Sequence, residues 1–207
     1  FFMKTLNSIL IALLLAAEHS QRIELMTGVA IAFARSPMTV ALQAWNLQKL
    51  SRGRFILGLG SQVQAHIEKR FSMPWAAPAE KMREFILALR AIWDCWGRGT
   101  PLKFRGKHYQ HTLMTPVFNP GPLEVPDPKI YLGALGPRMI EVAGEVADGL
   151  YGHPFNTMKY IEEVQLAPLR QGLAKSQRTL KDFDMPAMII TITGRNDEEM
   201  AAADFAM

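Results

Sequence analysis

The amino-acid sequence predicts an α/β fold in which parallel β-strands alternate with α-helices. Short apolar runs recur along the chain, and such runs are typical of strands that are buried on both faces of a parallel sheet. Each run is followed by a segment whose apolar residues repeat at helical spacing, which indicates a helix packed on the sheet. The predicted strands are residues 22–33, 54–60, 129–133, 148–153 and 185–193.

The composition allows one sizeable hydrophobic core and limits the classes of molecule that we expect the protein to bind. Of the 207 residues, 49% are hydrophobic and 20% are charged, as in ordinary globular domains. The net charge of +4 comes from scattered lysines and arginines, so we expect no binding to nucleic acid, although a small polyanionic ligand would suit it. The single cysteine, Cys95, excludes an internal disulfide and a cysteine-based metal cluster, and its apolar neighbours predict a buried thiol.

The first predicted element is ambiguous. Residues 1–17 combine Lys4, a short apolar run and two alanines, which imitates a signal peptide, but the run is too short to span a bilayer. The apolar residues also fall on one helical face, and we favour a helix packed on the sheet of a cytoplasmic protein without membrane contact. This face comprises Leu6, Ile9, Leu10, Leu13, Leu14 and Ala17.

The first two strands contain glycines that suggest a close approach between the backbone and a ligand. Gly28 lies within the first strand, where a glycine usually marks a bulge or such an approach. Gly58 and Gly60 lie in the second strand, and Ser61 and Gln62 can offer hydrogen bonds just beyond it. A lone Gly-x-Gly is weak evidence for a nucleotide site, because the third glycine of a dinucleotide fingerprint is missing.

Three helices are predicted in this part of the chain: one follows the first strand and two follow the second. Ser36 is the expected N-cap of the first, with Pro37 in its first turn, and a short helical piece carries His66 and Arg70 on a solvated face. The buried stripe of the first helix is Val40, Ala41, Ala44, Leu47 and Leu50. The third helix, residues 78–96, carries a core stripe of Met82, Phe85, Ile86, Leu89, Ile92, Trp93 and Trp96.

A long excursion, residues 101–128, separates this helix from the next strand. Residues 102–105 and 108–112 predict a small hairpin, in which His108 and His111 fall on opposite faces, so we expect no metal site. Loops of this length inside a compact domain tend to be lids or binding loops.

Residues 129–138 form the strongest candidate for a binding site. A short strand leads into a turn made of Gly133, Ala134, Leu135 and Gly136. Pro137 is well placed to begin a helix that runs to about residue 147. Free N–H groups and the positive end of the helix dipole would then face outward beside Arg138, as in many phosphate sites. A plain connection between a strand and a helix is the alternative.

The remaining units complete a single predicted domain that covers residues 1–207. A strand ends at His153, a helix follows at about 157–175, residues 184–194 form another strand, and a helix begins at Asp197. A closed barrel of eight units usually needs about 250 residues, so five units indicate either an open sheet or part of a barrel. In a barrel, the segments that follow the strands would form one ligand-binding rim.

Several stretches, taken together and in order, resemble the bacterial luciferase-like superfamily. They are LSRGRFILGLG at residues 50–60, YLGALGP at 131–137 and AGEVADG at 143–149. With RFSMPW at residues 70–75 and AIWDCW at 91–96, the sequence is most similar to the deazaflavin (F420)-dependent oxidoreductases of that superfamily. The resemblance covers about residues 12–194.

The resemblance implies a (β/α)8 TIM-barrel type of fold, here incomplete, with about five of eight strands. The sequence lacks counterparts of the family's first two strands and of its eighth strand. It also lacks the acid/base residues that many members carry near the second strand. The family places F420 or FMN at the rim of the barrel. Family members have a cis-peptide bulge behind the cofactor ring, and its position matches Gly28 and Val29 of this sequence. The loop for the cofactor phosphate matches residues 133–138, and Ser61 and Gln62 would also touch the cofactor.

The activity implied by the resemblance is hydride transfer between F420 and a small organic substrate. His153 would then be the catalytic or substrate-binding residue, while Asp148, at the other end of that strand, would be structural. Two alternatives stay open: an FMN-dependent monooxygenase on the same scaffold, and a non-catalytic truncated paralogue that binds a cofactor or a partner. Assembly as a homodimer also stays open.

Overall fold

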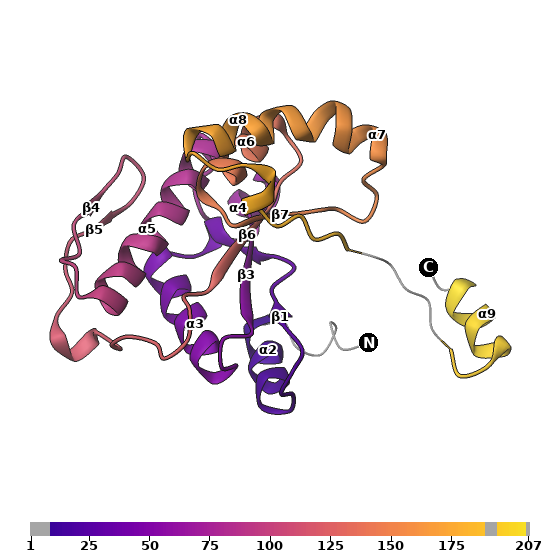
Figure 1. Ribbon diagram of the computed structural model, residues 1–207, viewed down its shortest axis with the longest axis horizontal. Coiled ribbons are helices and arrows are strands. Elements are labelled where there is room, and N and C mark those ends of the chain that lie inside the picture. The colour runs from indigo at the N-terminus through magenta and orange to yellow at the C-terminus, as the bar shows by residue number, and fades with distance from the viewer. Residues whose placement is uncertain (1–8, 189–193, 206–207) are drawn as a thin grey trace.

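The computed structural model describes residues 9–188 and 194–205 and contains one mainly parallel sheet flanked by helices (Figure 1). Strand β3 pairs on one side with β1 and β2 and on the other with β6, which pairs with β7, and all these pairs are parallel. The strands are β1 (Leu25–Met26), β2 (Ala30–Ile31), β3 (Phe55–Gly60), β6 (Lys129–Gly133) and β7 (Gly149–Tyr151).

Helices follow the strands in the predicted order, which confirms the alternation of β and α units. The longer helices are α2 (Ile9–Glu18), α3 (Pro37–Leu50), α4 (Gln64–Lys69), α5 (Pro78–Arg98), α6 (Pro137–Val146), α8 (Leu166–Lys175) and α9 (Asp197–Phe205). The short turns are η1 (Ala32–Ala34), η2 (Pro116–Phe118), α7 (Met158–Tyr160), η3 (Ile161–Gln165) and η4 (Leu180–Asp182). The predicted hairpin is present as the antiparallel pair β4 (Phe104–Arg105) and β5 (Gln110–His111).

The first predicted strand, residues 22–33, is not continuous. It is divided into β1 and β2 around a cis peptide bond between Gly28 and Val29, the position indicated by the family resemblance, and it ends in the 3₁₀ turn η1. Between the two pieces, Thr27 is fully buried, and its hydroxyl donates to the carbonyl of Gly58 over 2.7 Å. A Cβ atom at Gly58 would overlap the carbonyl oxygen of Thr27. Gly58 therefore makes room for the neighbouring backbone and not for a ligand.

Helix α3 begins as predicted. Its buried face agrees with the prediction up to Leu47 and differs from it in the last turn. Ser36 accepts a hydrogen bond from the backbone N–H of Thr39 over 3.2 Å. Leu50, predicted to be buried, is 57% exposed, because the buried face continues through Gln48 and Ser51. The Gln48 amide donates to the carbonyl of Pro126 and accepts from the N–H of Phe55, so that a polar residue fills this core position at no loss of hydrogen bonds.

Helix α2 is less buried than predicted. Ala17 is buried and Leu10 and Leu13 are half-buried, but Leu14 is 40% exposed, and the predicted contribution of Leu6 lies outside the described residues. The helix contacts α3 and β1, which together cover only a narrow strip of its surface. No helix among the described residues is both long enough and apolar enough to cross a membrane.

Helix α5 supplies the centre of the core, and the whole predicted stripe of methionine, isoleucine and aromatic side chains is buried. Cys95 is also buried, as predicted. The Trp45 ring packs edge-on against Trp96 at 5.6 Å and is stacked with Trp93 at 6.3 Å between ring centroids. This cluster fixes α3 against α5 on one side of the sheet.

Helix α6, which follows β6, is held from behind by α8. A Cβ atom at Gly144 would lie 2.5 Å from the carbonyl oxygen of Leu169, and one at Gly172 would overlap the carbonyl of Glu141. The two helices are therefore in backbone contact at these glycines. The predicted helix 157–175 contains a π-helical turn, η3, just before Pro168, which lacks the N–H that a regular α-helix would use there.

The last predicted strand is described only in part. Residues 184–187 run parallel to β7, with the N–H of Leu150 donating to Asp184 and that of Gly152 donating to Pro186. They form isolated bridges only, because Pro186 has no N–H for a continuous ladder. The rest of this predicted strand, residues 189–193, lies outside the described residues.

Candidate functional site

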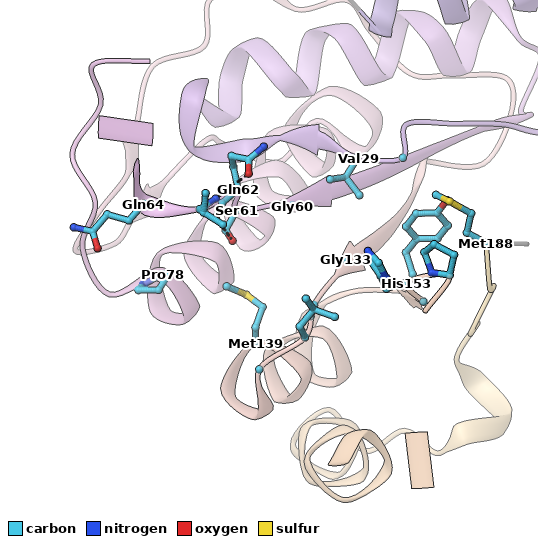
Figure 2. A pocket seen from close by; sticks show the side chains of 18 of the residues that line it. Val29, Gly60, Ser61, Gln62, Gln64, Pro78, Gly133, Met139, His153 and Met188 are labelled. Carbon is cyan, nitrogen blue, oxygen red and sulfur yellow. Dashed lines mark hydrogen bonds between the residues drawn. The ribbon is translucent and has the colours of Figure 1, made fainter. Parts of the chain in front are cut away.

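A cleft of about 750 Å³ opens at the carboxyl ends of the parallel strands (Figure 2). Segments from four strand ends meet there: β1–β2, β3, β6 and β7. Most of the predicted site residues line this cleft, although they are far apart in the sequence. They are Gly28, Val29, Ser61, Gln62, Gly133, Ala134, Leu135, Gly136 and His153.

Two predicted residues lie elsewhere. Pro137 and Arg138 line a neighbouring hollow between the starts of α5 and α6, which shares Pro78, Gly136 and Met139 with the main cleft. Helix α6 begins at Pro137, so these two side chains belong to its first turn and not to the strand end. Arg138 is exposed, and its expected place beside a bound phosphate stays a prediction.

The Val29 side chain lies on the floor of the cleft. A Cβ atom at Gly60 would collide with one Val29 methyl group, and one at Gly133 would come within 3.3 Å of the other. Glycine at these two strand ends therefore accommodates Val29, which lies beside both in Figure 2. The cis peptide bond between Gly28 and Val29 lies at this floor.

The turn after β6 offers uncommitted backbone donors. Gly136 is the N-cap of α6 and has no side chain that could cap the helix. The amides of Met139 and Ile140 donate to the Gly136 carbonyl, whereas within the described part of the chain those of Leu135 and Gly136 have no protein acceptor. Together with the helix dipole, such amides favour a bound anion. The amides of Leu135 and Gly136, just before α6, thus have no acceptor among the described residues.

His153 is exposed at the end of β7. Its Nδ1 atom accepts a hydrogen bond from the backbone N–H of Phe155 over 3.2 Å, and the two rings are 5.2 Å apart between centroids. A ring nitrogen that accepts carries no proton, so Nε2 bears the hydrogen in the neutral ring. His153 is therefore oriented by its neighbour as a donor through Nε2.

The cleft has no Asp, Glu, Lys or Arg among the described residues that line it. Its walls include side chains that the sequence analysis did not select: Val63, Trp75, Met139, Tyr151, Pro154 and Met188. Tyr151 could have been found from strand periodicity, because it lies two residues before His153 and alternate residues of a strand share a face. Trp75 packs edge-on against Phe33 at 5.7 Å, a contact that sequence spacing does not reveal.

A cluster of three metal-ligand side chains lies away from the cleft. Oxygen or nitrogen atoms of Glu80, Glu84 and His108 lie within 4.8 Å of one another. However, the Glu84 carboxylate accepts from the backbone N–H groups of residues 107–109, and the Lys107 ammonium lies 3.2 Å from Glu80. Burial alone would raise the pKa of Glu84, but these backbone hydrogen bonds lower it below its ordinary value. The cluster fastens the hairpin to α5, and we assign no metal to it.

Charged side chains gather at the opposite, amino ends of the strands. The Asp148 carboxylate accepts from the N–H of Ile130 over 2.7 Å and from Arg90 over 2.9 Å. Hydrogen bonds from Lys129 and Tyr131 to Asp184 lower the pKa of that carboxyl group. Asp148, expected to be structural, therefore lies far along the strand from the cleft and ties β6 to α5.

Comparisons with known proteins add to this geometry. A family model described as luciferase-like monooxygenase matches residues 3–204. An uncharacterized protein of Mycobacterium tuberculosis is 52% identical over 191 residues, covering 92% of this chain and 56% of its own. Another protein of that organism, provisionally named a coenzyme F420-dependent oxidoreductase, is 30% identical over 184 residues, covering 82% and 50%. The chain thus spans about half the length of the curated relatives it matches.

The fold itself recurs among solved structures. A monooxygenase from Streptomyces bottropensis superposes with a TM-score of 0.74 at 17% identity, over 96% of this chain and 62% of the other. The likeness confirms the predicted barrel-type α/β fold, of which the described strands form a part.

Proposed function

This chain belongs to the luciferase-like monooxygenase family, and on that premise we propose that its cleft binds coenzyme F420 and a small organic substrate, as part of an F420-dependent oxidoreductase. The observation that carries the proposal is the turn after β6, in which the amides of Leu135 and Gly136, just before α6, have no acceptor among the described residues. A phosphate group carried by a flavin-type cofactor is the ligand that such amides favour.

The residues present fit the rest of such a cofactor. The floor is the Val29 side chain, and the walls are Val63, Trp75, Leu135 and Met139, which suit a flat, largely apolar ring system. Ser61 and Gln62 add polar groups at the end of β3. FMN also carries a phosphate and a flat ring, so an FMN-dependent monooxygenase is the alternative. We favour F420 because the relative that is 30% identical to this chain is named for that coenzyme.

The chain's own residues would bind and orient the reactants. F420, when bound, supplies or accepts a hydride at its ring. Backbone amides of Leu135 and Gly136 hold the phosphate, and the apolar walls exclude water from the ring. His153 lines the cleft and keeps its Nε2 free of the contact with Phe155, so that this group can hold a proton near a substrate oxygen.

Titration of the 207-residue chain with F420 and with FMN tests the proposal, with the fluorescence of each cofactor as the readout. The matched pair of variants is Gly136→Pro and Gly136→Ala. Gly136 has φ −79° and ψ 147°, which proline can adopt, so Gly136→Pro removes one N–H donor with little change in backbone conformation. Gly136→Ala keeps the N–H, and its Cβ atom would enter open space.

We expect Gly136→Pro to weaken F420 binding by roughly tenfold or more, as for the loss of a hydrogen bond to a charged group. Gly136→Ala should change the dissociation constant by less than about twofold, within the range of surface substitutions. Equal effects of the two substitutions, or no binding of either cofactor, would remove the proposal. Tighter binding of FMN would replace it with the monooxygenase alternative, and cofactor binding without turnover would favour a non-catalytic paralogue.

A further inference from the structure

Tyr151 lies in the cleft, two residues before His153, at the carboxyl end of β7. Residues at i and i+2 of a strand point to the same side, and both side chains line the cleft. The phenol and the imidazole therefore both border the cleft near the end of β7.

The hydroxyl group of Tyr151 is placed for a ligand. A Cβ atom at Gly28 would lie only 3.2 Å from it, so the hydroxyl reaches the floor of the cleft, beside the peptide of Gly28 and Val29. Two other tyrosines have protein acceptors at 2.6 Å: Tyr131 donates to Asp184, and Tyr160 donates to the carbonyl of Leu135. Within the described residues, the Tyr151 hydroxyl has no such partner, although Tyr151 is half-buried.

The surroundings of this pair restrict what it can bind. No Asp, Glu, Lys or Arg of the described chain lines the cleft, whereas the apolar side chains of Pro154 and Met188 do. A charged group that gave up hydration water against this wall would gain no ion pair in return, which is unfavourable. A neutral group with an acceptor oxygen would instead receive hydrogen bonds from both donors.

We propose that Tyr151 is a substrate-binding residue that, together with His153, selects uncharged apolar molecules bearing a carbonyl or hydroxyl oxygen. This inference rests on the proposed function, because it takes the remainder of the cleft to be occupied by the cofactor. The phenol O–H and the imidazole Nε2–H both donate to the same substrate oxygen. Because no lysine or arginine of the described chain lines the cleft, the site discriminates against carboxylates of the same shape.

Three probes of nearly equal shape separate these features. Acetophenone has the carbonyl, α-methylstyrene has a CH₂ group in place of the oxygen, and benzoate carries a charge. Calorimetric titration of the F420-loaded 207-residue chain measures the affinity for each probe. Acetophenone should bind about fivefold to tenfold more tightly than either analogue, the range expected for hydrogen bonds to a neutral acceptor.

The decisive variant is Tyr151→Phe, which removes only the hydroxyl. It should weaken acetophenone binding by about fivefold and change α-methylstyrene binding by less than twofold. The matched control is Tyr109→Phe, because Tyr109 packs against Phe85 in the hairpin and does not line the cleft, and it should change neither affinity.

Three outcomes would overturn the inference: equal weakening for both neutral probes, tighter binding of benzoate, or an effect of Tyr151→Phe on F420 affinity alone. The F420 titration is recorded in parallel, so that a failure of the proposed function is recognised separately. If no cofactor binds, the same titrations on the cofactor-free chain still compare the probes, and acetophenone selectivity that depends on Tyr151 would support the substrate site alone.

Discussion

The two ends of the parallel sheet differ in how fully their polar groups are paired. At the amino ends, the guanidinium group of Arg54 donates to the carbonyls of Ala17, Ser20, Ile23 and Ser51 and to the Ser20 hydroxyl. Asp148 and Asp184 are likewise paired there. At the carboxyl ends, the amides of Leu135 and Gly136 and the Tyr151 hydroxyl have no acceptor among the described residues.

This difference indicates that one end of each strand stabilises the fold and the other end is available to bind a ligand. The same strands that end in the cleft begin in a network of ion pairs and buried hydrogen bonds. Paired groups stabilise the fold, whereas groups without a protein partner gain one only when a ligand binds. Substitutions at the two ends should therefore affect different measurements.

The largest expected effect comes from a comparison of two arginines. Arg54→Ala at the amino end removes five hydrogen bonds and should lower the free energy of unfolding by about 3 kcal/mol, because α2 loses its link to β3. Arg138→Ala at the carboxyl end removes an exposed side chain and should change it by less than about 0.5 kcal/mol. Urea denaturation measures both, and similar losses would contradict the proposed difference between the two ends.

A second comparison pairs the two ends of one strand. Asp148→Ala should lower the free energy of unfolding by about 2 kcal/mol, because the N–H of Ile130 and the Arg90 side chain lose a charged acceptor. His153→Ala, at the other end of β7, should leave stability nearly unchanged and weaken acetophenone binding. If His153→Ala proved the more destabilising of the two, the carboxyl end would also serve the fold.

The smallest expected effect is a dependence of stability on pH. The pKa of Asp184 is lowered in the folded state by its hydrogen bonds to Lys129 and Tyr131. Its contribution to stability is therefore present above the unfolded pKa of about 3.9 and is lost as the pH falls through the lower folded value. Because the pair is partly exposed, we expect it to contribute less than about 1 kcal/mol.

Asp184→Asn tests this expectation. The difference in free energy of unfolding between the variant and the natural sequence should shrink as the pH falls from about 6 to about 3. Glu162→Gln, an exposed substitution outside the described ion pairs, is the control and should leave the pH profile unchanged. A difference that stays constant over this range would show that Asp184 does not act through its charge.

The sequence predicted the parts of this fold that depend on local pattern. Apolar runs located β3, β6 and β7, and the turn after β6 was recognised because glycine and proline have local preferences for conformation. For the first strand, Gly28 alone suggested a bulge or a close approach to a ligand, and the family resemblance indicated a cis-peptide bulge at Gly28 and Val29. The cause of the division of this strand, the contact between Thr27 and Gly58, joins residues that are distant in sequence.

The sequence predicted the glycines, the turn and the histidine of the candidate site, but not the apolar side chains that form its walls. Glycines and the histidine were selected because their types suggest chemistry, and nine of the eleven predicted residues line the cleft. Pro137 and Arg138 line the neighbouring hollow instead, and their side-chain direction could not be read from the sequence because it depends on how α6 packs. Trp75 and Met188 were missed because their place in the cleft depends on tertiary packing.

The glycine contact between α6 and α8 has a practical consequence for engineering. At Gly144 and Gly172 the two helices touch through main-chain atoms, so their spacing does not depend on which side chains surround the contact. The outer residues of α8, such as the exposed Arg170, could therefore carry dyes, surface tethers or added charges without displacing the amides at the start of α6. Alanine at either glycine would instead force the helices apart and shift those amides, which makes this crossing a poor choice for redesign.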